Sequence, residues 1–266
     1  MSTELQTERI GATQIMTLVG PGARNALSPQ VYAAGIETLN VAESNDDVRA
    51  VILTGAGGHF CGGGELQGLA HNRPHDLPTQ AENLDAFHQW IEALRSFPKP
   101  IIAAVEGIAA GAGASLMLAC DLVVAAENAR FLMRHNQVGL SPEGGASWHL
   151  TRALGRGRAL QLLWQNNPSS AQQMAQWGLV HQVVPEGMVL QSALALVEQL
   201  AQTPAGVLSS IKELVNEAPV HTLRHQLDAE KQHFIVNLSR AEAGQTIDDS
   251  ADAKRGGAQA AGGLGK

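Results

Sequence analysis

Two glycine-rich turns could offer unpaired backbone N–H groups to a ligand. The first, residues 56–66, reads Ala-Gly-Gly-His-Phe-Cys-Gly-Gly-Gly-Glu-Leu and follows an apolar run. The second, residues 107–113, reads Gly-Ile-Ala-Ala-Gly-Ala-Gly and leads into a helix predicted to open near Ala112. Glycine lets a ligand approach the backbone closely, and the first turn of a helix leaves its N–H groups free. Such groups can hold an anion, or an oxygen that becomes anionic during a reaction.

The glycine pattern of these turns bears on two kinds of ligand, a thioester and a nucleotide. Two donors from two separate backbone turns are what the enolate of a thioester would need. Each stretch by itself also fits an ordinary tight turn, because glycine turns are common. Neither turn carries the third glycine of a dinucleotide fingerprint, and the chain contains no Gly-Lys-Ser/Thr of a P-loop. A nicotinamide enzyme is therefore not expected.

The ordered set of motifs resembles the crotonase family, also called the enoyl-CoA hydratase/isomerase superfamily. The likeness rests on residues 60–66 and 104–121, on Gly-Leu-Ser-Pro-Glu-Gly-Gly at 139–145, and on Ala-Gln-Trp-Gly-Leu-Val at 175–180. It runs from about Glu8 to about Leu238. The resemblance implies an α/β fold, in which ββα units wind into a spiral of two nearly perpendicular sheets. It also implies an acyl-CoA thioester as the substrate.

The resemblance assigns ligand contacts to particular residues. The backbone N–H groups of Gly64 and Ala112 match the two donors of the family's oxyanion hole. Coenzyme A would lie along Ala23 and Arg24, with the backbone of Gly62 near the adenine. Arg24 could pair with a phosphate, or it could be a solvated arginine on a turn. The residues expected to contact the substrate or its CoA are Ala23, Arg24, Gly62, Gly63, Leu66 and Ser115.

The acid and base of a hydratase are missing from their usual places. Hydratases of the family resembled hold a water with two glutamates, and here those positions carry Ser115 and His135. Ser115 has no nearby signature of an activated nucleophile, so a small helix residue is the simpler interpretation. His135 could shuttle a proton near neutral pH, or it could be a partly exposed polar residue.

Glu143 is the remaining candidate for a base. It lies where some isomerases and ring-processing enzymes of the family carry a catalytic carboxylate. One carboxylate suffices for a 1,3-proton shift, because no activated water is needed. Burial against an acyl chain would raise its pKa towards the value useful for a base. The alternative is a glutamate in the first turn of a helix, favoured there by the helix dipole.

The composition excludes several other classes of protein. The 266 residues are 44% hydrophobic and 16% charged, which describes a soluble globular protein. This length allows one large domain with an appendage, or two small domains. A formal charge of −7 argues against nucleic acid as a partner. No apolar run reaches the roughly 18 residues that span a bilayer, so no membrane partner is expected.

Cysteine and histidine usage points to a reduced protein without a metal. The chain has two cysteines, Cys61 and Cys120, and its start lacks the basic and apolar segments of a signal peptide. A cytoplasmic location is the expectation. None of the ten histidines pairs with Cys or Glu at ligand spacing, so no metal site is expected. No cofactor is expected either, since coenzyme A is part of the substrate.

Local patterns predict the elements that position the turns. The predicted strands lie within residues 8–19, as an edge hairpin, and at 48–54, 101–105 and 122–125. The predicted helices run from Pro29 to about residue 44, from Thr79 onwards, and within 139–154, with a loop at 71–78. Strand, glycine turn and helix thus recur three times, which suggests stacked ββα units.

The C-terminal part is predicted to be helical. Helices at 188–200, 204–218 and 221–238 follow the core, which we place at residues 1–200. Residues 201–250 are the predicted oligomerisation region, because in the family this region packs across a trimer interface. A homotrimer or a homohexamer is therefore expected. Residues 251–266 are rich in Gly and Ala, which predicts a disordered tail in place of the basic, aromatic segment usual in the family.

Three functions follow from these residues. The favoured one is an enoyl-CoA isomerase that uses Glu143 as base. The second is an enoyl-CoA hydratase or CoA-ring hydrolase in which His135 and Glu143 share the acid and base roles. The third is a non-catalytic acyl-CoA-binding relative, because both hydratase glutamates are absent.

Overall fold

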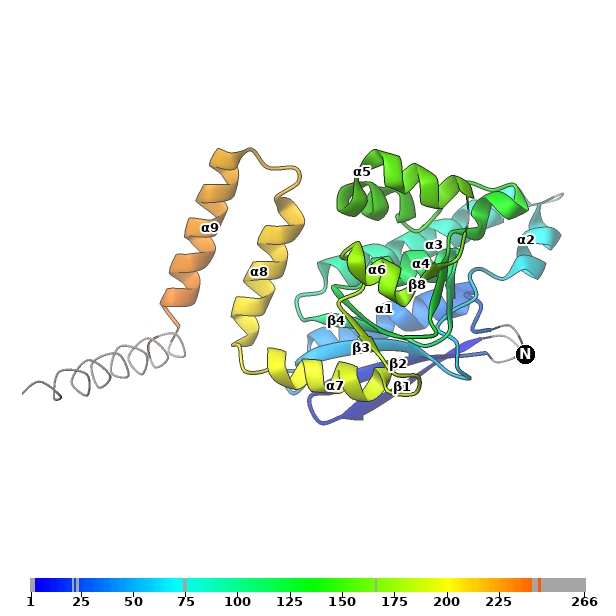
Figure 1. Cartoon of the computed structure of the whole chain (residues 1–266). Coiled ribbons are helices and arrows are strands. Elements are labelled where there is room, and N and C mark those ends of the chain that lie inside the picture. Colours follow the sequence, from blue (N-terminus) through cyan, green and yellow to red (C-terminus); the bar gives the residue numbers. More distant parts are fainter. Residues whose placement is uncertain are drawn as a thin grey trace, which may run out of the picture. The chain divides into compact units, whose positions relative to one another are not determined.

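A computed structural model describes residues 3–20, 22, 24–73, 76–165, 167–240 and 244 of the chain. The chain divides into two compact units, the first ending at Gln202 and the second beginning at Thr203. The described strands all belong to the first unit, and the second contributes two helices, α8 and α9 (Figure 1).

The first unit is built on a mostly parallel sheet. Six of its described strands are ordered β1-β2-β3-β4-β6-β9; β1 and β2 form an antiparallel hairpin at one edge, and the other neighbours are parallel. A smaller sheet has the order β5-β7-β8. The strands are β1 (Glu4–Ile10), β2 (Thr13–Val19), β3 (Ala50–Gly55), β4 (Ile101–Val105), β5 (Ile108–Ala110), β6 (Leu122–Ala126), β7 (Arg130–Leu132), β8 (Ser169–Ser170) and β9 (Gln182–Val184). The predicted edge hairpin and the three longer predicted strands are confirmed.

Helices cover both faces of the large sheet, which explains why its parallel strands are apolar throughout. Successive strand residues point to opposite faces. Val51 and Leu53 belong to the core shared with helices α1 and α3, whereas Ile52 packs into a second core with helix α7. One short apolar strand therefore contributes side chains to both cores.

The helices largely follow their predicted positions. They are α1 (Pro29–Glu43), α2 (Leu66–Asn72), α3 (Leu77–Ser96), α4 (Ala112–Leu118), the 3₁₀ helix η2 (Arg134–Val138), α5 (Ala146–Gln165), α6 (Ala171–Gln176), α7 (Val189–Leu200), α8 (Ala205–Glu217) and α9 (Leu223–Leu238). Helix α1 begins at Pro29 as predicted, and α4 opens at Ala112 as predicted. Ser28 occupies the N-cap position of α1, but its side chain makes no capping hydrogen bond.

The segment between helices is shorter than the loop predicted at 71–78. Helix α2 extends to Asn72, and helix α3 already begins at Leu77. The Asp76 carboxylate caps α3 by accepting a hydrogen bond from the Thr79 N–H at 3.0 Å. Pro78 fits the first turn of this helix, because the N–H that proline lacks would have no partner there. Proline and polar residues thus mark the start of a helix here.

Helix α5 begins later and ends later than predicted. Gly144 and Gly145 have φ angles of +62° and +77°, outside the helical range, so the helix starts only at Ala146. It continues to Gln165 across a break at Gly155. Glu143 consequently lies in the turn before α5, which excludes the alternative of a glutamate in the first helical turn.

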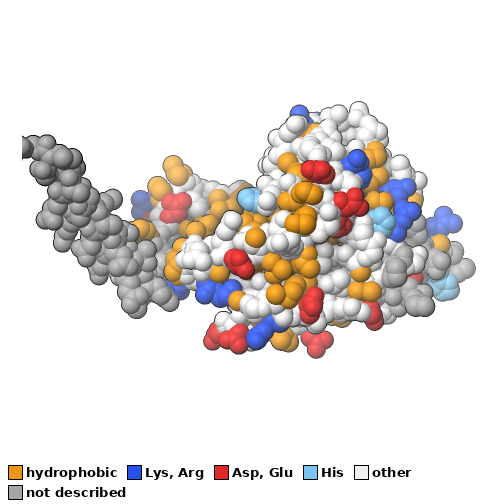
Figure 2. Space-filling view, turned by 60° about the horizontal axis from the view of Figure 1, so that its bottom comes forward, with side chains coloured by type: hydrophobic (Ala, Val, Ile, Leu, Met, Phe, Trp, Pro, Cys, Tyr) orange, Lys and Arg blue, Asp and Glu red, His pale blue; other side chains and the backbone are white. Residues whose placement is uncertain are grey.

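The described part of the second unit contains a pair of packed helices. Asn237 of α9 donates a hydrogen bond to Ser210 of α8 at 3.1 Å, and no described residue of α9 is buried. Its exposed large apolar side chains are Ile211, Val215, Val220, Leu223, Leu227, Phe234, Ile235, Val236 and Leu238. Figure 2 shows hydrophobic side chains exposed on one face of the molecule. None of the described helices is both long and apolar enough to cross a membrane.

Candidate active site

The two glycine turns are joined directly through Cys61. Its N–H donates to the Ile108 carbonyl and its own carbonyl accepts from the Ala110 N–H, both at 2.9 Å. Gly113 sits against this junction, since a methyl group at its Cα would meet Cys61 atoms at 2.6–2.7 Å. Burial raises the pKa of the Cys61 thiol to about 12, so the side chain acts as a neutral packing group. The structure thus brings together two turns that are about fifty residues apart.

The two predicted oxyanion donors lie beside this junction. A Cβ atom built on Gly63 would lie 3.8 Å from the Ala112 nitrogen, and its φ of +111° suits glycine. A Cβ atom on Gly64 would meet nothing within 4 Å. Neither the Gly64 N–H nor the Ala112 N–H donates to an acceptor within the described part of the chain. Both donors are therefore free for a ligand.

Glu143 and His135 come together next to the second glycine turn. Glu143 Oε2 lies 3.1 Å from His135 Nε2. The contact lies within ion-pair distance, but neither ring nitrogen of His135 makes an aligned hydrogen bond to any described residue. His135 is 6% exposed, so the alternative of a partly exposed polar residue is wrong. Its Nε2 lies 3.9 Å from a Cβ built on Gly111, which places the pair beside the Ala112 donor.

Ser115 is buried on α4, one turn from Ala112. Its hydroxyl donates to the Glu143 carbonyl at 2.8 Å and lies 3.4 Å from the Gly111 carbonyl. The hydroxyl thus connects the second glycine turn to the backbone of Glu143. Its expected contact with the substrate stays a prediction.

The predicted CoA residues are described only in part. Arg24 is exposed with a φ of +50°, and its carbonyl accepts the Gly62 N–H at 2.7 Å. The Gly62 N–H is therefore paired within the protein, and the expected approach of an adenine to the Gly62 backbone stays a prediction. Ala23 lies outside the described residues, and so does the side chain of Leu66. Their contacts with CoA remain predictions.

Asn25 is a site residue that the sequence analysis missed. It is fully buried; its side chain accepts from the Gly20 N–H at 2.9 Å and donates to the carbonyls of Ala56 and His59 at 2.9 and 2.8 Å. These bonds hold the Arg24 turn against the first glycine turn. An asparagine in a turn after a strand was the available signal, since its side chain readily satisfies backbone groups.

Tyr32 of α1 is a further buried side chain, and Glu143 is among the charged groups that act on it. Burial, together with Cys61, Glu143 and Glu65, raises the pKa of Tyr32 above its usual value. Its ring lies 5.1 Å from the Phe87 ring, measured between centroids. The phenol is therefore a neutral group.

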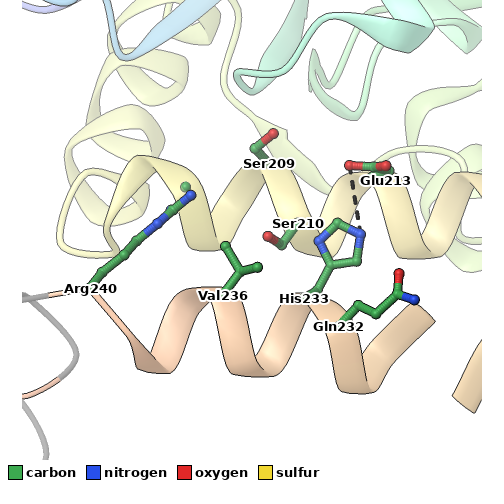
Figure 3. Close-up of a pocket in the computed structure, with 8 residues that line it drawn as sticks. Ser209, Ser210, Glu213, Gln232, His233, Val236 and Arg240 are labelled. Carbon is green, nitrogen blue, oxygen red and sulfur yellow. Dashed lines mark ion pairs between the residues drawn. The ribbon is translucent and has the colours of Figure 1, made fainter. Parts of the chain in front are cut away.

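A pocket between α8 and α9 lies in the second unit (Figure 3). It holds about 350 Å³ and is lined by Gly206, Ser209, Ser210, Glu213, Gln232, His233, Val236 and Arg240. His233 Nε2 points towards Glu213 Oε2 at 3.8 Å. None of the predicted site residues lines it. Within the described residues, no group of three or more His, Cys, Asp or Glu is arranged to hold a metal ion.

Comparisons with known proteins agree with this geometry. The family model described as enoyl-CoA hydratase/isomerase matches residues 9–249. The chain is 37% identical to a 1,2-epoxyphenylacetyl-CoA isomerase of Escherichia coli, over 82% of this chain and 84% of that protein. It is 33% identical to a 2,3-dehydroadipyl-CoA hydratase of the same organism, over 88% and 90%. The crystal structure of an enoyl-CoA hydratase from Polaromonas sp. JS666 superposes with a TM-score of 0.92 at 48% identity, covering 94% of this chain and 97% of that one.

Proposed function

Since this chain belongs to the enoyl-CoA hydratase/isomerase family, we propose that it isomerises an enoyl-CoA thioester with Glu143 as the base. The predicted crotonase fold is confirmed by the structural match. The family acts on acyl-CoA substrates, and relatives with isomerase and with hydratase activity both match this chain. The carrying observation is that Glu143 contacts His135, whose ring lies beside the second glycine turn with its unpaired Ala112 N–H.

The reaction is a proton transfer between two carbons. The thioester oxygen accepts hydrogen bonds from the N–H groups of Gly64 and Ala112, which stabilise negative charge on that oxygen. Glu143 removes a proton from the α-carbon of a 3-enoyl thioester, and the electron pair delocalises into a dienolate. Glu143 then returns the proton to the γ-carbon, so that the double bond becomes conjugated with the thioester. No cofactor beyond the substrate's own CoA takes part.

A hydratase is the second candidate, and the His135–Glu143 contact favours it. Adding water to a double bond needs two groups that hold one water and exchange its protons. The 3.1 Å separation of the two side chains would let them share that task. A ring hydrolase would use the same pair. A non-catalytic acyl-CoA-binding protein is the third candidate.

A panel of enoyl-CoA thioesters in heavy water, followed by mass spectrometry, separates these functions. We expect a 3-enoyl-CoA to become the 2-enoyl form, with solvent deuterium at the α- or γ-carbon. Hydration of crotonyl-CoA should be slow, because Ser115 stands in place of a hydratase glutamate. Hydration at about 1–1000 turnovers per second would establish the hydratase instead. Tight binding of the thioester without deuterium exchange would establish the non-catalytic protein.

We also propose that the protein assembles as a homotrimer or a homohexamer in the cytoplasm. The two helices of the second unit expose more apolar side chains than a helix pair can cover, and exposed patches of this kind mark interfaces. Neither Cys61 nor Cys120 forms a disulfide, which suits a reducing compartment.

The Phe234→Asp variant tests this assembly. Phe234 is 66% exposed on α9. The wild-type protein should sediment as a trimer or hexamer, and Phe234→Asp should sediment as smaller species, because a carboxylate does not pack into an apolar interface. Lys231→Asp is the matched control, because Lys231 lies on the same helix and is exposed to a similar degree, 67%, but is a charged residue paired with Asp228. This variant should assemble normally. A stable wild-type monomer would contradict the proposal.

A further inference from the structure

The peptide unit between Glu143 and Gly144 is held from both sides by side chains of other helices. Its carbonyl oxygen accepts a hydrogen bond from Ser115 Oγ of α4 at 2.8 Å. Its N–H donates to His88 Nε2 of α3 at 3.4 Å. One peptide plane is thus fixed at its acceptor and at its donor.

The turn at residues 143–145 needs hydrogen bonds from other parts of the chain to fix its orientation. Gly144 and Gly145 both have positive φ angles, and glycine restricts the backbone less than any other residue. Gly144 also has to be small, because a Cβ atom there would meet the Phe87 ring, and the Ser115 Cβ at 2.9 Å. The turn that carries Glu143 is therefore pressed against Ser115, while its own sequence leaves the orientation of the peptide free.

The hydrogen bonds from Ser115 and to His88 differ in strength. Ser115 is fully buried and its bond is short, so no water can take the place of the hydroxyl at the Glu143 carbonyl. His88 is exposed and its bond is long, so water can replace the ring nitrogen at the Gly144 N–H. Ser115 should therefore dominate the orientation of this peptide.

We propose that Ser115 is a positioning residue for Glu143. The inference rests on the proposed function, in which Glu143 is the base. Through the Glu143 carbonyl, Ser115 fixes the direction in which the Glu143 side chain leaves the turn, towards His135 and the second glycine turn. His88 contributes to the same orientation as the weaker partner. Ser115 thus takes a backbone-holding role at a position where a hydratase glutamate was expected.

Ser115→Ala removes the stronger of the two hydrogen bonds without adding volume. We expect kcat for isomerisation to fall about tenfold, the typical effect of losing one buried hydrogen bond, while KM for the thioester changes by less than about twofold. Ser115→Thr keeps a hydroxyl but adds a methyl group at a fully buried position, so it should recover part of kcat. His88→Leu should lower kcat by about twofold, and His88→Gln, which keeps an acceptor, should not lower it. Steady-state kinetics on a 3-enoyl-CoA measures all four variants.

Thr54→Val is the matched control. Thr54 also donates a buried hydroxyl bond to a backbone carbonyl, that of Ala104 at 2.9 Å, but it lies within the large sheet. This variant should lose stability as Ser115→Ala does and should keep kcat. Equal losses of kcat in both variants would show a general stability effect and overturn the proposal.

Glu143→Gln, measured beside them, separates the two proposals. If Glu143→Gln isomerises normally, the proposed function fails, whatever Ser115 does. If Glu143→Gln is inactive and Ser115→Ala has the wild-type kcat, the positioning role alone fails.

Discussion

Replacing Glu143 with glutamine is expected to lower the rate of isomerisation by about 10²–10⁴-fold, the usual contribution of a general base. Glutamine keeps the size and shape of the side chain but cannot accept the proton from the α-carbon. The affinity for CoA should change little, because the predicted CoA contacts are on the Arg24 turn and the first glycine turn. Turnover of a 3-enoyl-CoA and calorimetric titration with a non-reactive acyl-CoA measure the two effects separately.

The Glu143→Gln result needs a control for the loss of a charge. Glu82→Gln removes an exposed carboxylate from α3 and should have the wild-type rate. Deuterium exchange at the α-carbon should disappear in Glu143→Gln and persist in Glu82→Gln. Normal isomerisation by Glu143→Gln would show that this residue only belongs to a turn. His135→Ala would then be the next variant, because its ring lies against the same carboxylate.

The second large effect should come from Gly113→Ala, which disturbs the junction of the two glycine turns. The added methyl group would lie 2.6 Å from Cys61 Cβ and 2.7 Å from its sulfur and carbonyl oxygen. The turns must then move apart, and the Gly64 and Ala112 N–H groups lose their relative placement. We expect kcat to fall by about 10²–10³-fold, as when one oxyanion donor is lost. The free energy of unfolding should fall by about 1–3 kcal/mol, as in other overpacked cores.

Gly157→Ala is the matched control for Gly113→Ala. It places the same methyl group on helix α5, where nothing lies within 4 Å of the new atom. It should keep the wild-type kcat and raise the free energy of unfolding by about 0.5–1 kcal/mol, because alanine is the better helix residue. Circular dichroism first establishes that both variants are folded. A folded Gly113→Ala variant with normal kcat would contradict the role given to the paired turns.

The sequence by itself determined the features that depend on neighbouring residues. Apolar alternation and continuous apolar runs predicted the edge hairpin and the strands β3, β4 and β6, because strand pattern is a local property. Pro29 marked the start of α1, and the glycines at 107–113 marked the opening of α4. The motif order identified the family, and the resemblance to that family gave the two backbone donors. These donors belong to the backbone, so their availability follows from the local turn and hardly depends on side-chain identity.

Only the tertiary structure decided the features that depend on contacts between distant residues. Strands β5, β7, β8 and β9 have two or three residues each, too few for a pattern, and exist because a partner strand lies beside them. The burial of His135 and its approach to Glu143 depend on how η2 and the following turn return to the second glycine turn. Likewise, the sequence around Ser115 does not reveal its hydrogen bond, because the acceptor, the Glu143 carbonyl, lies 28 residues away in the chain. The type of a side chain determines which hydrogen bonds it can make, and only the packing of the folded chain determines which residue becomes its partner.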